Sequence, residues 1–261
     1  MKPLSVCIPA YEMRGLGHIY LKESLDILCN QTFKDFEVVI CDNSKNSEIK
    51  NLCDEYTEKL DLHYFANPKG TGLSSNLNFV IKNKCATGKF IKILAQDDFL
   101  YGEKSLETLV KNIDPDKDHW IVTGCIHTRD CKIFFKPFYP RYNRMIHLGN
   151  NTIGGLDVLT IKNVDPLLFD ETLLWLLDCE YYKRCYDKYG SPKIISEILA
   201  AVRLGDYNIT NTEATLRVRT SDFNQVLKQY EKGLSYWYYK IIYYIKYPLR
   251  KIKLSMHGFW K

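Results

Sequence analysis

The stretch Phe90-Ile91-Lys92-Ile93-Leu94-Ala95-Gln96-Asp97-Asp98 decides the fold, because it joins a mostly apolar run to two adjacent carboxylates. Such a run predicts a buried strand, and acids at its end are poor core residues but good ligands for hard cations. Mg²⁺ and Mn²⁺ usually bind one or two carboxylates and keep other positions for phosphates and water. The alternative is that Asp97 and Asp98 only begin a turn or cap a helix. The stretch indicates metal-assisted chemistry on a diphosphate.

Strands and helices alternate around this stretch. The first strand runs from Leu4 to Ile8 and is followed by a helix from about Ile19 to Asn30. A second strand, Phe36 to Cys41, precedes a helix from about Ser74 to Lys84. Alternating units of this kind, without repeats or low-complexity linkers, favour parallel strands. We therefore expect an α/β fold with a mostly parallel sheet and flanking helices.

Polar residues stand where the predicted strands end. Pro9-Ala10-Tyr11 ends the first strand, Asp42 follows the second, and Asp97 and Asp98 follow the apolar run described above. Open α/β sheets bind ligands at the carboxyl ends of their strands. Tyr11 could stack on a nucleobase and Asp42 could accept a hydrogen bond from its imide; alternatively, they are a half-buried tyrosine and a turn residue. Together these positions predict a nucleoside diphosphate as the ligand.

The order of these motifs resembles that of the family 2 inverting glycosyltransferases of the GT-A fold, a Rossmann-like architecture, over about residues 3 to 205. Each motif is short, but the ordered set is specific. The motifs are Leu4-Ser5-Val6-Cys7-Ile8-Pro9-Ala10-Tyr11, Ser24-Leu25-Asp26-Ile27-Leu28-Cys29-Asn30-Gln31-Thr32-Phe33, Phe36-Glu37-Val38-Val39-Ile40-Cys41-Asp42-Asn43-Ser44, Gly72-Leu73-Ser74-Ser75-Asn76-Leu77-Asn78, Gly88-Lys89-Phe90-Ile91-Lys92 and Gln96-Asp97-Asp98.

The resemblance also implies roles for single residues. It implies that Asp98, the second Asp of the "DXD" pattern, binds Mn²⁺ or Mg²⁺. UDP is the first expected nucleotide and dTDP the next. The residues implied to bind the nucleotide are Pro9, Ala10, Tyr11, Asp42, Asn78 and Asp97.

Inversion requires a base that removes the proton of the acceptor hydroxyl as it attacks the anomeric carbon. The resemblance assigns this base to the second acid of a Glu-Asp pair; here Leu177 replaces the first acid, which leaves Asp178. The alternative role for Asp178 is a helix N-cap. Glu180 and Asp170 are weaker candidates, for contact with the acceptor or for orienting the base.

Other positions are expected near the sugars. Many relatives have a histidine close to the diphosphate after the final strand, whereas here Arg203 is followed by Leu204-Gly205-Asp206. Either charged residue of this run is a candidate substitute. The segment 149–155, which includes Gly154, resembles the stretch that lines the donor sugar and acceptor, or is a plain glycine turn. We therefore expect Gly154, Glu180 and Arg203 near the donor or acceptor sugar.

Basic charge is concentrated at the end of the chain. From Lys228 onward, eight Lys and Arg residues accompany one acid, so this segment carries +7 and the rest of the chain −2 of a total of +5. A nucleic-acid enzyme would spread positive charge over its catalytic face, so nucleic acid is not an expected partner. We predict a catalytic domain at residues 1–210, with a nucleotide-binding half at about 1–100 and an acceptor half at about 101–210, and a basic aromatic helical extension at 211–261.

The extension carries apolar and aromatic residues near helical spacing from Leu227 to Tyr244. It is too short and too charged to span a bilayer, which requires about 20 apolar residues. One expectation is that it lies on an anionic membrane surface. The other is that it packs on its own domain or on a second subunit in a homodimer.

The cysteines and the N-terminus indicate in which cellular compartment the protein is expected. The nine cysteines are odd in number, spread out and mostly within apolar runs, without a CxxC pair, which is typical of reduced core thiols. The N-terminus lacks the long apolar region of a secretion signal. We expect a cytoplasmic protein, with the inner face of a membrane as a peripheral location.

The resemblance, together with these observations, implies a metal-dependent inverting glycosyltransferase that moves a sugar from a nucleoside diphosphate donor to a glycan or lipid-linked saccharide, in surface polysaccharide or glycoconjugate synthesis. A non-catalytic sugar- or nucleotide-binding scaffold is the alternative, because fold does not fix function. A sugar nucleotidyltransferase is less favoured. It would carry a Gly-rich, basic phosphate loop after the first strand, and Pro9-Ala10-Tyr11-Glu12-Met13-Arg14-Gly15 is not such a loop.

Overall fold

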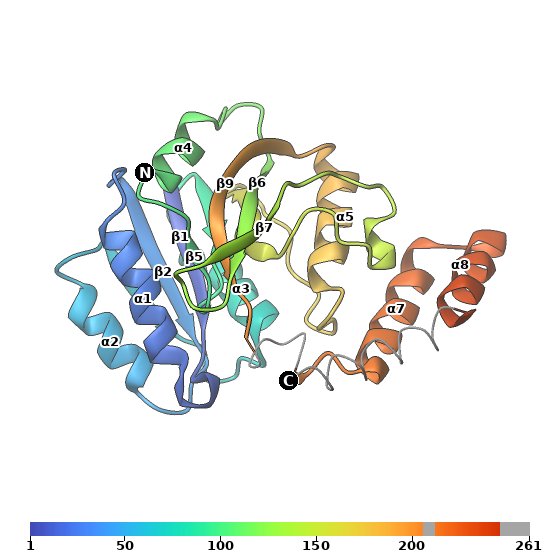
Figure 1. The fold of residues 1–261 in the computed structure, drawn as a ribbon, viewed down its shortest axis with the longest axis horizontal. Coiled ribbons are helices and arrows are strands. Elements are labelled where there is room, and N and C mark those ends of the chain that lie inside the picture. The colour runs from blue at the N-terminus through green and yellow to red at the C-terminus, as the bar shows by residue number, and fades with distance from the viewer. Residues whose placement is uncertain (206–211, 246–261) are drawn as a thin grey trace.

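The computed structural model describes residues 1–205 and 212–245, and in this part of the chain nine strands form one sheet with helices on both faces (Figure 1). Asp206 and residues 246–261, on which some sequence predictions fall, lie outside the described residues. The strands are β1 (Leu4–Ala10), β2 (Phe36–Asp42), β3 (Leu62–Ala66), β4 (Phe90–Ile93), β5 (Phe99–Leu100), β6 (Trp120–Thr128), β7 (Phe134–Phe138), β8 (Leu159–Lys162) and β9 (Lys193–Arg203). The helices are α1 (Gly17–Cys29), α2 (Glu48–Tyr56), α3 (Leu73–Lys82), α4 (Ser105–Lys111), α5 (Leu177–Tyr189), α7 (Leu216–Tyr230) and α8 (Gly233–Ile245), with 3-10 turns at Met13–Gly15, Ile146–Leu148 and Leu156–Val158.

The sheet is parallel in its first half and mixed beyond it. The strand order is β3-β2-β1-β4-β8-β6-β9-β5, with β7 paired to β6. β3, β2, β1 and β4 are parallel neighbours, as the alternating pattern predicts. β8 is antiparallel to both β4 and β6, whereas β6 and β9 are parallel. The carboxyl ends of β1, β2 and β4 therefore meet at one edge of the sheet.

Side chains of the central strands alternate between two cores, because successive residues of a strand point to opposite faces. On β1, Val6 and Ile8 belong to the core that includes α1, α2 and α4, whereas Cys7 belongs to the core that includes α3, α5 and α7. Burial of both faces explains why Leu4–Ala10 is a nearly continuous apolar run.

The predicted elements are present, with shifted ends. The first helix begins at Gly17 rather than Ile19. β1 and β2 run past their predicted ends because Ala10 and Asp42 still pair across the two strands. Asp42 is therefore the last residue of β2, and the turn begins after it.

The two described helices of the C-terminal extension differ in burial. Phe223, Val226 and Leu227 of α7 lie in the same core as α3 and α5. α8 packs on α7 through Tyr243, whose ring stacks on that of Phe223 with a centroid distance of 3.8 Å. Of the helices in residues 1–205 and 212–245, none is long and apolar enough to cross a membrane.

All nine cysteines are free thiols, and seven of them are buried. Burial raises the pKa of Cys53 to about 12, and raises those of the other core thiols in the same direction. Protonated, buried thiols are poor nucleophiles. This agrees with the expectation that the cysteines are reduced core residues.

Candidate active site

A cavity of about 390 Å³ lies where β1 and β4 end, a size typical of small-molecule sites. The ends of β1 and β4 and the first turn of α3 form one part of its wall, and the segment before α5 forms another. Four residues predicted from the sequence line it: Pro9, Tyr11, Asp97 and Asp98. Further lining residues are Met13, Asn43, Thr71, Gly72, Leu73, Ser74, Ser75, Asn76, Ala95, Gln96, Glu171, Leu173, Leu174, Leu177 and Glu213.

Three carboxyl groups gather where β4 ends. Asp97 and Asp98 line the cavity, and Asp157, from the turn before β8, accepts the Ala95 N–H at 2.6 Å. Asp98 accepts the backbone N–H of Arg203 at 2.6 Å, so β9 also supports this segment. Because β8 is antiparallel to β4, the residues before β8 lie beside the carboxyl end of β4. Asp157 is thus a member of the acidic site that the sequence analysis missed.

Burial among like charges shifts the acidity of these groups. Burial and the nearby Asp157 charge raise the pKa of Asp97 to about 6. Burial, Asp157 and Asp97 raise the pKa of Asp98 well above its ordinary value. Such shifts mean that the fully ionised cluster carries more negative charge than its surroundings, including the Arg203 charge that lowers the pKa of Asp97, compensate. A divalent cation would supply the missing positive charge, and a donor set made only of oxygens fits Mg²⁺ or Mn²⁺.

Gln96 fixes the segment after β1 against the end of β4. Its Oε1 accepts the Tyr11 N–H at 2.9 Å, and its Nε2 donates to the Gly17 carbonyl at 2.8 Å. A Cβ added at Gly17 would come within 2.2 Å of the Tyr11 carbonyl oxygen, so only glycine fits this approach. These contacts hold Tyr11 at the cavity wall.

Asparagine side chains connect the ends of β1 and β2 with the start of α3. Asn76 Nδ2 donates to the Ala10 carbonyl at 3.1 Å and to Asn43 Oδ1 at 3.0 Å. Ala10, which the resemblance assigns to nucleotide binding, is buried and is not among the lining residues of the described chain. The first turn of α3, including Ser74 and Ser75, lines the cavity. The N–H groups and dipole of a helix N-terminus favour anions such as a diphosphate.

Asp42 and Asn78, which the resemblance assigns to nucleotide binding, are buried and are not among the lining residues of the described chain. Asp42 accepts the Tyr64 hydroxyl at 2.8 Å. Asn78 accepts the Phe169 N–H at 2.7 Å and donates to a Glu171 carboxylate oxygen at 2.7 Å. Asn78 thus positions Glu171, a cavity carboxylate to which the sequence analysis gave no role.

Asp178 lies in the first turn of α5, whose N-cap is Leu176, so the N-cap alternative does not hold. Its Oδ2 accepts Asn151 Nδ2–H at 2.6 Å, and Asn151 Oδ1 in turn accepts the Gly154 N–H at 2.9 Å. Burial raises the pKa of Asp178 to about 6, although its hydrogen bonds act in the opposite direction. Its neighbour Leu177 lines the cavity; Asp178 and Gly154 do not, as far as the described residues go.

α7 holds the segment that precedes α5. Asp222 Oδ2 accepts the N–H groups of Leu174, Trp175 and Leu176 at 3.0, 2.7 and 3.1 Å. The Asp222 residue is only 4% exposed. A carboxylate here is favoured by the positive end of the α5 dipole. The C-terminal extension therefore supports part of the cavity wall.

Glu180 and Arg203 form ion pairs and do not line the cavity within the described residues. Arg184 donates to both Glu180 carboxylate oxygens, at 2.6 and 2.7 Å, and the Tyr230 hydroxyl donates to one of them at 2.8 Å. The Arg203 guanidinium donates to Glu23 on α1 at 2.6 Å. Glu180 thus connects α5 to α7. Arg203 acts on the acidic site through its backbone N–H, which Asp98 accepts, and through its charge, which lowers the pKa of Asp97.

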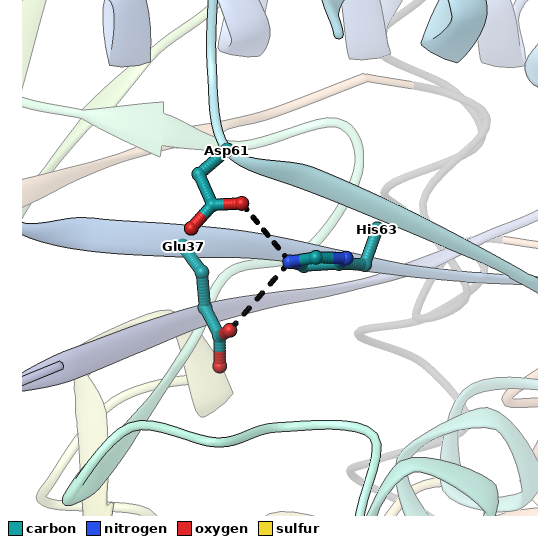
Figure 2. A group of neighbouring side chains, drawn as sticks. All are labelled: Glu37, Asp61 and His63. Atoms are coloured by element: carbon teal, nitrogen blue, oxygen red, sulfur yellow. Dashed lines mark ion pairs between the residues drawn. The ribbon is translucent and has the colours of Figure 1, made fainter. Parts of the chain in front are cut away.

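A second group that could hold a metal ion consists of Glu37, Asp61 and His63 (Figure 2). His63 Nε2 lies 3.1 Å from Asp61 Oδ1 and 3.8 Å from Glu37 Oε2. Glu37 is five residues before Asp42 on β2, so this group lies roughly 17 Å from the strand end at the cavity. Asp61 already pairs with Lys2 at 2.5 Å. Because it lies far from the cavity, this group is a different site from the acids at the end of β4.

Comparisons with known proteins agree with this architecture. A family model described as glycosyl transferase family 2 matches residues 5–161. An uncharacterized glycosyltransferase of Rickettsia prowazekii is 31% identical over 220 residues, covering 80% of this chain and 66% of that protein. One of Methanocaldococcus jannaschii is 27% identical over 197 residues, covering 71% and 66%. The chain thus spans 66% of the length of these relatives.

Solved structures share the fold at low sequence identity. A Staphylococcus aureus TarS fragment in complex with UDP-GlcNAc superposes with a TM-score of 0.67 at 19% identity, covering 88% of this chain and 65% of that chain. The mannosyltransferase PcManGT of Pyrobaculum calidifontis, in complex with GDP-Man and Mn²⁺, gives a TM-score of 0.60 at 15% identity, covering 89% and 65%.

The fold is that of the GT-A glycosyltransferases, which confirms the fold class expected from the sequence. Within that class, the chain belongs to glycosyl transferase family 2.

Proposed function

We propose that this chain transfers a sugar from a nucleoside diphosphate donor, with UDP the first nucleotide to test and dTDP the next, to a hydroxyl of a glycan or lipid-linked saccharide. The transfer inverts the anomeric carbon, takes place in the cytosol and serves the synthesis of a surface polysaccharide or glycoconjugate. One observation carries the proposal: a single cavity combines an aromatic side chain, Tyr11, a carboxylate pair, Asp97 and Asp98, and the N-terminus of α3.

The parts of the cavity match the parts of a nucleotide sugar. Tyr11 stacks on the base, Asp42 orders the adjoining turn by accepting the Ser44 N–H at 2.8 Å, and the first turn of α3 favours the phosphates. Asp98 and Asp97 would hold Mn²⁺ or Mg²⁺. Such a cation would neutralise charge on the diphosphate and so stabilise it as a leaving group.

The proposed base is Asp178. At neutral pH a carboxyl group with a pKa of about 6 is mostly ionised and is still a stronger base than an ordinary aspartate. Asn151 holds one oxygen at 2.6 Å, which orients the carboxylate. Glu171 is the competing candidate, because it lies in the cavity wall itself.

Calorimetric titration with UDP, dTDP, GDP and CDP, each with Mn²⁺, Mg²⁺ or EDTA, tests the proposal. We expect one nucleotide to bind in the presence of a divalent cation, and Asp98→Asn to lose the cation-dependent part. Asn at this position can still accept the Arg203 N–H, so the fold should survive. Asp116→Asn, in an exposed loop, is the matched control.

Two results would contradict the proposal. If the nucleotide bound with equal affinity in EDTA and in Mn²⁺ or Mg²⁺, the cation would have no part in donor binding. Failure of every nucleotide to bind under all conditions would favour the non-catalytic scaffold.

A further inference from the structure

The helix α8 is apolar on two opposite faces. Tyr243, on one face, is 2% exposed and stacks on Phe223 of α7. On the other face, Leu234 is 89%, Trp237 59% and Ile241 55% exposed. An amphipathic helix on a globular domain normally turns its apolar stripe inward, so α8 has one apolar face more than its packing on α7 requires.

The exposed residues form one stripe, which we call the α8 face: Leu234, Trp237, Tyr238, Ile241, Tyr244 and Ile245. At 3.6 residues per turn they span about 120° of the helix circumference. Tyr243 lies about 180° from Leu234 on the same count. The α8 face therefore points away from the contact with α7, and Figure 1 shows α8 at the end of the molecule farthest from α1 and α2.

The charge around the α8 face indicates which kind of surface binds it. Lys232 directly precedes α8 and Lys240 lies within it, and the Lys240 ammonium lies 5.2 Å from the centre of the Trp237 ring. The sequence from 246 to 261 adds five Lys and Arg residues and no acid. Pairing two copies of such a segment would bring like charges together, whereas an anionic surface would attract them.

We propose that the α8 face docks on an anionic lipid bilayer surface, with α8 lying in the plane of the interface. Apolar side chains enter the acyl boundary, the Trp and Tyr rings sit at headgroup level, and Lys232 and Lys240 meet the lipid phosphates. This docking is independent of the nucleotide site, which is formed by other elements.

Co-sedimentation of the full chain with vesicles tests the docking. The vesicles are made of phosphatidylcholine alone or with added phosphatidylglycerol. We expect binding to the anionic vesicles, weakening with added salt, and little binding to the neutral ones. The double variant Trp237→Ser/Ile241→Ser should bind about tenfold or more weakly, because it removes two large apolar side chains from the interface. Both residues are exposed, so the fold should be unaffected, as thermal denaturation would verify.

A matched control replaces exposed apolar residues elsewhere. Ile133 and Val164 are 67% and 68% exposed, and Ile133→Ser/Val164→Ser should bind vesicles as the unmodified chain does. The proposal is overturned if the full chain binds neither vesicle, if it binds both equally, or if both double variants behave alike. Concentration-dependent dimerisation that the α8 double variant abolishes, without vesicle binding, would instead assign the α8 face to a second copy.

Discussion

Replacing Asp222 by alanine should destabilise the protein more than any ordinary surface substitution. The single oxygen Oδ2 satisfies three backbone N–H groups, those of Leu174, Trp175 and Leu176. Removing it leaves three donors at a largely buried helix start without their acceptor. The folded chain has no other carboxylate bonded to these groups among the contacts of the described residues.

The expected magnitude follows from these contacts. A hydrogen bond to a charged group contributes about 1.5–3 kcal/mol, and three bonds to one oxygen are not additive. We therefore expect Asp222→Ala to lose about 3–5 kcal/mol of unfolding free energy. For a domain of this size each 1 kcal/mol lowers Tm by about 2–4 °C, so the midpoint should fall by about 6–20 °C. Asp222→Asn keeps a carbonyl oxygen but not the charge and should lose about 1–2 kcal/mol.

Urea unfolding followed by circular dichroism measures these losses. Asp116→Ala, in an exposed loop, is the control and should change stability by less than about 0.5 kcal/mol. Because the capped segment lines the cavity through Leu173, Leu174 and Leu177, nucleotide affinity should fall with stability. A loss of less than about 1 kcal/mol in Asp222→Ala would refute the capping role.

Three further outcomes are expected. Asp178→Asn should lower turnover by about 10²- to 10⁴-fold in a UDP-release assay while leaving nucleotide affinity unchanged; a larger effect of Glu171→Gln would move the base to Glu171. With a pKa of about 6 for Asp178, turnover should fall about tenfold from pH 7 to pH 5. Asn151→Ala should move this fall in turnover to higher pH, because a hydrogen bond that lowers the pKa of Asp178 is lost. A turnover that does not change with pH would contradict the assignment. Burial lowers the pKa of Lys92 to about 8, so the unfolded chain binds more protons above that pH and stability should rise towards about pH 10. Lys92→Met should show a flatter dependence in urea unfolding, and an unchanged slope would exclude Lys92 as its source.

The sequence predicted those parts of the site that depend on the end of a parallel strand. Tyr11, Asp97 and Asp98 follow buried apolar runs, and parallel neighbours bring such ends together. Asp157 could not be found in this way. It precedes a short strand, and only the antiparallel pairing of β8 with β4 places that position beside Asp98.

Side-chain partners were also hidden from the sequence. Asp42 and Asn78 stand in motifs that predict ligand contact, but each is held by a residue distant in the chain, Tyr64 or Phe169. Arg203 is similar, because its guanidinium donates to Glu23 of α1 and its backbone N–H donates to Asp98. Local pattern fixes where a residue lies along a strand or helix, and tertiary packing decides which group it contacts.

The C-terminal extension shows why composition alone divides this chain differently from its packing. Basic and aromatic residues make 211–261 distinct in sequence, yet α7 places Val226 and Leu227 in the main core and Asp222 at the start of α5. A helix that packs inward and also holds the cavity wall is part of the fold that makes the site. On α8, one apolar face packs on α7 and the opposite face is exposed. α8 in turn rests on α7 through the stacked rings of Tyr243 and Phe223, and α7 holds the segment before Asp178 through Asp222.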